Sequence, residues 1–236
     1  MKCNWLKLRY KLQGESGRES ETSSHNGVLF LDELPEFRKN VLEVLRQPME
    51  DGQVTISRAN SRVTYPANFM LVAAMNPCPC GFLGDPKRQC RCSFLQIQRY
   101  RSKISGPLMD RIDIHIEVPP VPYKELADRS EGASSAEMLQ RVMRAREVQT
   151  ARFRGTPIHT NARMNTRQIK EFCKIDSRSS ELLEKAMDKF GLSARAHARI
   201  LKIARTIADL DQCRNIQPNH IAEAIQYRSL DRTLVL

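Results

Sequence analysis

The sequence has no long hydrophobic run. Its 236 residues contain no stretch of about 18 consecutive apolar residues, the length that a membrane-spanning helix needs. Residues 1–13 mix Lys2, Lys7, Arg9 and Lys11 with their hydrophobic neighbours, so they do not form the apolar region of a secretory signal. We therefore expect a cytoplasmic protein with no membrane partner.

The sequence also lacks a P-loop, the glycine-rich loop G-x-x-x-x-G-K-[ST] whose backbone N–H groups and lysine hold nucleotide phosphates. None of its ten glycines is followed by lysine. Neither nucleotide binding nor ATPase activity is therefore predicted for this chain acting alone.

The composition is that of a globular protein with a basic surplus. Apolar residues make up 41% and charged residues 28%, which excludes a collagen, a coiled-coil rod and a disordered tail. The net charge is +11 and the isoelectric point is near 9.5. Most of the surplus lies in residues 123–236, so a polyanion such as nucleic acid is one expected partner; a basic surface that only confers solubility explains it equally well.

Changes in composition and hydrophobic pattern along the sequence predict three segments. Residues 1–24 end in a Gly, Ser and Glu stretch and are expected to be an unrelated or disordered leader. Residues 25–122 show strands and helices of an α/β domain, and Pro119, Pro120 and Pro122 mark its end. Residues 123–236 are helical throughout, with helix starts predicted at Ser134, Asn165, Asp176, Ser193 and Pro218.

The α/β segment has apolar runs typical of a parallel sheet. Residues 28–31 and 69–75 are predicted to be strands buried on both faces, and residues 112–118 a third strand. A helix is expected over residues 36–47, ended by Pro48, and a β-hairpin over residues 53–66.

Three polar residues follow the first two strands. Asp32 and Glu33 end one strand and Asn76 ends the other, and ligands bind beyond the carboxyl ends of parallel strands. Such acids can hold Mg²⁺ beside a phosphate chain and activate a water, while the amide hydrogen-bonds to both. The alternative is that all three residues only terminate strands and form turns.

Two arginines are further candidates. Arg111 precedes the third predicted strand, where it could reach the phosphates of a neighbouring subunit; a salt bridge with Asp110 or Asp113 is the alternative. Arg195 lies in the first turn of its helix, where the helix dipole disfavours a cation, so an anion is expected nearby. Arg199 and Lys202 lie on the same helix face as Arg195. They could bind phosphate together with it, or they could simply form a solvated basic face.

Five motifs together resemble the AAA+ ATPases of the magnesium-chelatase-like group, of the competence-associated ComM type. They are VLFLDE (28–33), the hairpin, VAAMNP (72–77), GPLMDRID (106–113) and LSARAHARILKIARTIADL (192–210). The resemblance implies a partial AAA+ αβα sheet with a hairpin insertion, followed by an all-α lid domain. It also implies a hexameric ring that uses ATP and Mg²⁺ to move DNA. By position it makes Asp32 and Glu33 the Walker B pair, Asn76 sensor 1, Arg111 the arginine finger and Arg195 sensor 2.

Four of the seven cysteines form two close pairs. Cys78, Cys80, Cys90 and Cys92 fall within the long connection before residue 93, and four thiolates at this spacing can close a structural Zn²⁺ site. The alternative is four reduced, partly buried thiols. The odd cysteine count argues against a disulfide framework in a cytosolic chain.

Arg58 and Arg62 flank the tip of the predicted hairpin, where they could touch a nucleic-acid backbone. The family resemblance makes this hairpin a pore loop, whereas an isolated hairpin of this kind is more often an exposed hairpin without a binding role.

The leading hypothesis for the whole chain is that it is part of an ATP-driven DNA motor for branch migration in recombination or natural transformation. The alternatives are a zinc-stabilised basic binding module without ATPase activity, and a magnesium-chelatase subunit.

Overall fold

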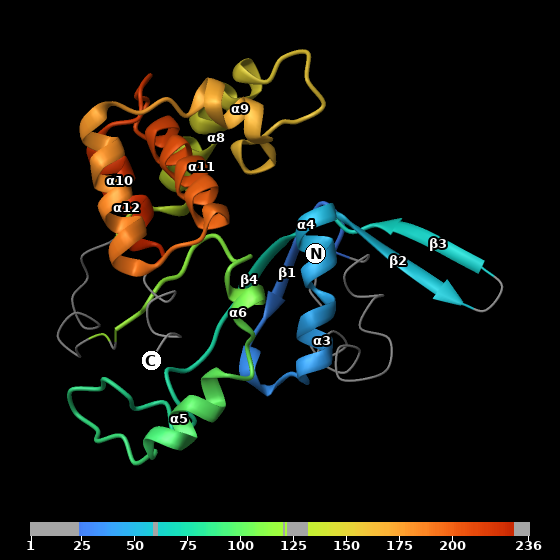
Figure 1. The fold of residues 1–236 in the computed structure, drawn as a ribbon, viewed down its shortest axis with the longest axis vertical. Coiled ribbons are helices and arrows are strands. Elements are labelled where there is room, and N and C mark those ends of the chain that lie inside the picture. Colours follow the sequence, from blue (N-terminus) through green and yellow to red (C-terminus); the bar gives the residue numbers. More distant parts are fainter. Residues whose placement is uncertain (1–23, 59–60, 120, 122–131, 229–236) are drawn as a thin grey trace. The chain divides into compact units, whose positions relative to one another are not determined.

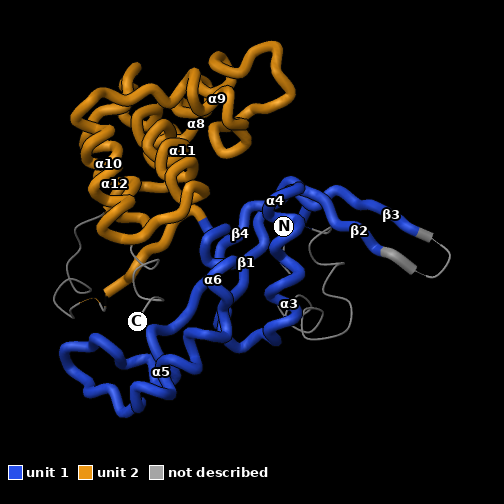
Figure 2. The backbone as a smooth tube through the Cα atoms, viewed as in Figure 1, with its two compact units in different colours: residues 1–112 blue, residues 113–236 orange. Residues whose placement is uncertain are grey.

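The computed structural model describes residues 24–58, 61–119, 121 and 132–228. The chain divides into two compact units, residues 1–112 and 113–236 (Figure 2). Residues 1–23 of the predicted leader and the predicted boundary at residue 122 lie outside the described residues.

Two parallel strands form the centre of the first unit. β1 (Val28–Leu31) pairs with β4 (Met70–Ala73), with Leu31 opposite Ala73, and the two lie side by side in Figure 1. Leu29 and Leu31 are 0% and 2% exposed, so β1 buries one face.

β4 is far less buried than its apolar sequence predicts. Met70 is 59% exposed and Val72 is 39% exposed. Within the described residues β4 pairs with β1 alone. Its other backbone edge therefore faces no strand, and the sheet is too narrow to cover the β4 side chains from solvent.

The helical segment after β1 is broken into three pieces. They are the 3₁₀ turn η1 (Leu34–Glu36) and the helices α3 (Lys39–Val44) and α4 (Arg46–Asp51). The expectation that Pro48 ends a helix is wrong: Pro48 lies in the first turn of α4, where its missing N–H costs no helical hydrogen bond. Gly52 ends α4 in the left-handed conformation, with φ 66°.

The β-hairpin is confirmed. β2 (Gln53–Arg58) and β3 (Ser61–Pro66) are antiparallel, and the hydroxyls of Thr55 and Thr64 lie 3.0 Å apart across the pair. Two helices follow β4 along the chain, α5 (Phe94–Arg101) and α6 (Gly106–Met109).

The third predicted strand, residues 112–118, does not form one in the structure. Ile114, Ile116 and Val118 are 47%, 66% and 83% exposed. A strand needs a neighbouring strand for its backbone hydrogen bonds, and no strand among the described residues pairs with this segment. His115 N does donate to Tyr227 O at 2.7 Å, but this bond is not part of a ladder.

The second unit is all-α, as the sequence predicts. Its elements are α8 (Ser135–Arg152), η2 (Asn161–Arg163), α9 (Thr166–Phe172), α10 (Ser177–Phe190), α11 (Ala194–Leu210) and α12 (Pro218–Gln226). The side chains of Ser134, Asn165, Asp176 and Ser193 cap their helices as expected. The core is built around α11, where Ile200, Ala204 and Ala208 are fully buried.

Candidate active site and cysteine cluster

The parallel pairing of β1 and β4 brings the predicted acids and the predicted amide to one edge of the sheet. Ala74 N donates to Leu31 O at 2.9 Å, and Leu34 N donates to Ala74 O at 2.9 Å. These bonds clamp the turn that carries Asp32 and Glu33 against the chain that leads to Asn76. All three residues are exposed at this edge.

Glu33 has a strained backbone. Its φ of 52° and ψ of 47° place it in the left-handed region, which residues other than glycine rarely adopt. Asp32 supports this turn, because its Oδ1 accepts a hydrogen bond from Glu33 N at 2.8 Å. Strain of this kind clusters at functional sites, where it directs a side chain out of the regular strand.

Asn76 is tied to α5 through its backbone. The hydroxyl of Tyr100 is hydrogen-bonded to the backbone of Asn76, and burial raises the pKa of this tyrosine. The next residue along the chain is also fixed, because Arg101 Nε donates to Pro77 O at 3.3 Å. Sequence spacing gave no signal for Tyr100, because the connection that carries the four cysteines, residues 77–93 (the cysteine loop), separates it from Asn76.

Arg111 is buried and paired within its own unit. Its Nη2 forms an ion pair with Glu50 Oε1 at 2.8 Å, and its Nη1 donates to Pro107 O at 2.6 Å. Glu50 lies at the end of α4, far from Arg111 in sequence, so sequence reasoning missed this partner. The arginine-finger role stays a prediction.

Arg195 lies in the first turn of α11, in the second unit, and is exposed. The rest of the predicted stripe is engaged within the unit. Arg199 forms an ion pair with Asp113, and Lys202 Nζ donates to Ala162 O at 2.9 Å. Burial lowers the pKa of Lys202. The sensor role of Arg195 stays a prediction.

The four predicted cysteine ligands converge. The Sγ atoms of Cys78, Cys80, Cys90 and Cys92 all lie within 4.8 Å of one another, and none of the four forms a disulfide. Cys78 lies 3.4 Å from Cys80 and 3.7 Å from Cys90, and Cys80 lies 3.6 Å from Cys90. A tetrahedron with metal–sulfur bonds of about 2.3 Å has edges of about 3.8 Å, so the cluster has the dimensions of a zinc site.

The thiols of this cluster differ in acidity. Hydrogen bonds from the backbone of Phe82 and Arg91 lower the pKa of Cys80 to about 6, so this thiol is available as a thiolate. The hydrogen bond with Cys80 raises the pKa of Cys92 to about 12. When a divalent metal binds such a cluster, it displaces the protons that the thiols still carry.

The hairpin places Arg58 opposite Ser61, one position from Arg62. The Arg62 side chain is exposed, and the tip between them, residues 59–60, lies outside the described residues. Nucleic-acid contact by Arg58 and Arg62 stays a prediction.

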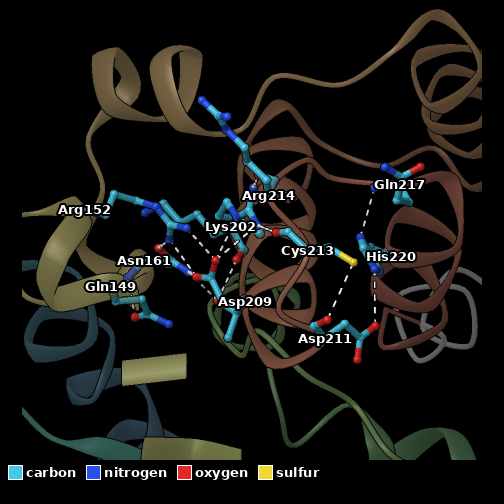
Figure 3. A network of polar contacts seen from close by, with 12 residues as sticks. Gln149, Arg152, Asn161, Lys202, Asp209, Asp211, Cys213, Arg214, Gln217 and His220 are labelled. Carbon is cyan, nitrogen blue, oxygen red and sulfur yellow. Dashed lines mark hydrogen bonds and ion pairs between the residues drawn. The ribbon is translucent and has the colours of Figure 1, made fainter. Parts of the chain in front are cut away.

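A buried polar network organises the second unit (Figure 3), and sequence reasoning did not identify it. Asp209 is 2% exposed and accepts hydrogen bonds from Arg152 Nη2 at 2.5 Å, Asn161 Nδ2 at 2.8 Å and Arg205 Nε at 3.1 Å. Only the i, i+4 spacing of Arg205 and Asp209 on α11 could have indicated it. A pocket of about 680 Å³ adjoins Arg152, Arg205 and Asp209, and no predicted site residue lines it.

None of the helices in the described ranges is both long and apolar enough to cross a membrane.

Comparison with known proteins gives two adjoining family matches. Residues 14–126 match the model of magnesium chelatase, subunit ChlI, and residues 132–228 match that of the ChlI C-terminal region. The competence protein ComM of Haemophilus influenzae is 47% identical over 210 residues, which cover 89% of this chain and 40% of that protein. The uncharacterized protein YifB of Escherichia coli is 46% identical over 214 residues, covering 90% of this chain and 41% of YifB.

The chain thus spans about two-fifths of the length of these relatives. The two family matches, together with the identity to ComM and YifB, show that the chain belongs to the magnesium-chelatase-like family of the ComM type.

Proposed function

We propose that this chain is part of an AAA+ ATPase of the ComM type that moves DNA, with branch migration in recombination or natural transformation as its task. The observation that carries the proposal is the parallel pairing of β1 and β4, which brings Asp32, Glu33 and Asn76 to one edge. The family supports ATPase chemistry, and the name of the Haemophilus relative supports a role in competence. A hexameric ring is part of the same proposal.

The proposed roles follow the chemistry of each side chain. Asp32 would hold Mg²⁺, which supplies positive charge beside the phosphates of ATP. Glu33 would orient and deprotonate the attacking water, and Asn76 would hydrogen-bond to both the water and a phosphate oxygen. Arg111 and Arg195 would stabilise charge on the γ-phosphate from adjacent subunits.

The P-loop for this site would be provided outside the 236 residues, since the sequence contains none. In this proposal residues 25–122 form part of the AAA+ core and residues 123–236 form the lid domain that carries Arg195. The hairpin with Arg58 and Arg62 would contact DNA in the pore, and the four cysteines would hold a structural Zn²⁺.

The experiment that tests the proposal introduces Glu33→Gln into a full-length relative that contains a P-loop, called the full-length protein below. The amide cannot accept a proton, so ATP should still bind while hydrolysis falls by about 10²- to 10⁴-fold. Glu36→Gln is the matched control, because Glu36 is also an exposed acid next to this turn and pairs only with Lys103 at 3.6 Å among the ion pairs described. Equal hydrolysis rates in both variants and the parent would contradict the proposal.

A second candidate is a zinc-stabilised basic binding module without ATPase activity. The absence of a P-loop and the convergence of four cysteines favour it. Equilibrium binding of labelled ATP to the full-length protein separates the two: micromolar binding supports the motor, and millimolar or no binding leaves only the module.

The match to a magnesium-chelatase subunit also keeps metal insertion into a porphyrin as a candidate. A chelatase assay with the full-length protein decides it, because turnover would assign that activity directly.

A further inference from the structure

The cysteine loop and the start of α5 carry an exposed aromatic side chain in a strongly basic setting. Phe94, the first residue of α5, is 73% exposed, and its neighbour Leu95 is 51% exposed. Single exposed hydrophobic residues are common on protein surfaces, so these two adjacent apolar side chains are informative only together with the charge around them. Figure 1 shows the loop and α5 together at one end of the first unit.

The segment that carries Phe94 is predominantly basic. Residues 77–103 contain a single acid, Asp85, and six basic residues: Lys87, Arg88, Arg91, Arg99, Arg101 and Lys103. Asp85 is already engaged, because its Oδ1 accepts hydrogen bonds from the backbone N–H groups of Lys87 at 2.7 Å and Arg88 at 3.0 Å. A divalent ion held by four thiolates would add two negative charges, and the segment would remain positive.

Three of these cations have no acidic partner within the described part of the chain. Arg101 and Lys103 are used internally, through Pro77 O and Glu36. Lys87, Arg91 and Arg99 are exposed and form no ion pair with any residue that the structure describes. Their charge is therefore available to an anionic ligand.

The exposed groups are held in place by the local structure. Arg91 lies between Cys90 and Cys92, so the thiol cluster fixes its backbone on both sides. Phe94 follows Ser93, which forms a capping box with Gln96 through bonds of 3.3 Å and 2.8 Å. Arg88 lies over the ring of Phe82 with its guanidinium carbon 5.1 Å from the ring centroid. Such preorganisation lowers the entropy lost on binding.

We propose that the cysteine loop and the first turn of α5 form a contact site for single-stranded nucleic acid, with a base stacked on Phe94 and phosphates held by Arg91 and its basic neighbours. An exposed ring with uncompensated cations around it is the combination that binds single strands, since every base has a face that can stack. A base in a duplex is already stacked between its neighbours, so the ring favours an unpaired strand.

This site adds to the proposed motor function but uses none of Asp32, Glu33 and Asn76, and its assay needs no ATP. A chain that binds a single strand through Phe94 while the full-length protein fails to hydrolyse ATP would refute the motor and keep the contact site. The reverse result would refute the contact site alone.

The first test measures binding of a fluorescein-labelled single-stranded oligonucleotide of mixed sequence to the full 236-residue chain by fluorescence anisotropy. Phe94→Ala should weaken binding by about 5- to 100-fold, the range that loss of one stacked base gives. Phe94→Trp should bind as tightly as the parent or more tightly. Phe94→Leu should be as weak as Phe94→Ala, because leucine keeps the apolar surface and loses the ring.

The second test separates phosphate contact from general charge. Arg91→Ala should reduce the slope of log affinity against log salt concentration by about 0.7, the value for one phosphate contact on a single strand. Arg38→Ala is the matched control, since it removes the same charge from an exposed position of the first unit outside the loop.

Metal content and circular dichroism of each variant verify that the loop is still folded. Parent protein that does not bind the oligonucleotide, or Phe94→Leu that binds like the parent, would overturn the proposal. So would loss of self-association or of protein binding in Phe94→Ala with unchanged oligonucleotide affinity, because the ring would then be a protein contact.

Discussion

At the scale of single residues, Glu33 combines the position proposed for the group that activates water with an unfavourable backbone conformation. A left-handed conformation costs a non-glycine residue about 1 kcal/mol, and the hydrogen bonds around Ala74 hold the turn in that conformation. The carboxylate is retained there at the expense of stability, which is expected where a side chain does chemistry.

Glu33→Gly should therefore stabilise the fold while removing activity. Glycine adopts this conformation without steric cost, so the free energy of unfolding should rise by about 1 kcal/mol in a urea titration. Hydrolysis by the full-length protein should fall as far as in Glu33→Gln. Glu36→Gly, within η1, should instead lower stability; a stability loss in Glu33→Gly as large as this control would refute the strain argument.

Asp209 has the largest predicted effect on stability in the second unit. Asp209→Asn leaves the buried guanidinium groups of Arg152 and Arg205 without their carboxylate, so unfolding should require about 3–5 kcal/mol less free energy. Asp211→Asn is the control, because Asp211 is 44% exposed and contacts only His220 among the ion pairs described. Thermal unfolding followed by circular dichroism at 222 nm measures both, and similar small losses would contradict the assigned role.

The candidate site residues at the carboxyl ends of β1 and β4 were predictable, because neighbouring parallel strands end on the same side of the sheet. Asp32, Glu33 and Asn76 needed only that rule. The partners Glu50 and Tyr100 were not predictable, because each contacts its site residue through a tertiary packing that spacing does not encode. The same holds for Asp113 as the partner of Arg199.

At the scale of elements, capping chemistry predicted the helices better than hydrophobic runs predicted the strands. A cap is a local interaction over three residues, as Ser134 with Glu137 shows. A strand depends on a distant neighbour, so residues 112–118 have strand-like alternation but no ladder. Pro48 was misread because its effect depends on where the helix begins.

The zinc proposal is tested on the cysteine loop, residues 77–93. The purified chain should contain about one zinc per molecule by elemental analysis, and Cys90→Ser should lose it. Removal of the metal should speed hydrogen exchange in residues 77–93 and at the start of α5, since the ion closes the loop. Cys213→Ser, outside the cluster, should keep full metal content. No metal in the parent, with four freely titratable thiols, would refute the zinc site.

At the scale of the whole molecule, the family explains why the two units occur in one chain. The match to ChlI covers most of the first unit and the match to its C-terminal region covers the helical unit. The sequence provides the acids, the amide, both arginines and the hairpin of the proposed motor, but no P-loop. The central claim is therefore that Asp32 and Glu33 face the metal and phosphates of a nucleotide whose P-loop lies elsewhere.

The most direct measurement of this claim is the Mg²⁺ dependence of ATP hydrolysis by the full-length protein carrying Asp32→Asn, with Asp188→Asn, an exposed acid on α10, as the control. Loss of a carboxylate ligand should raise the Mg²⁺ concentration for half-maximal hydrolysis by about tenfold or more, and the control should match the parent. An unchanged Mg²⁺ requirement in Asp32→Asn would contradict the account.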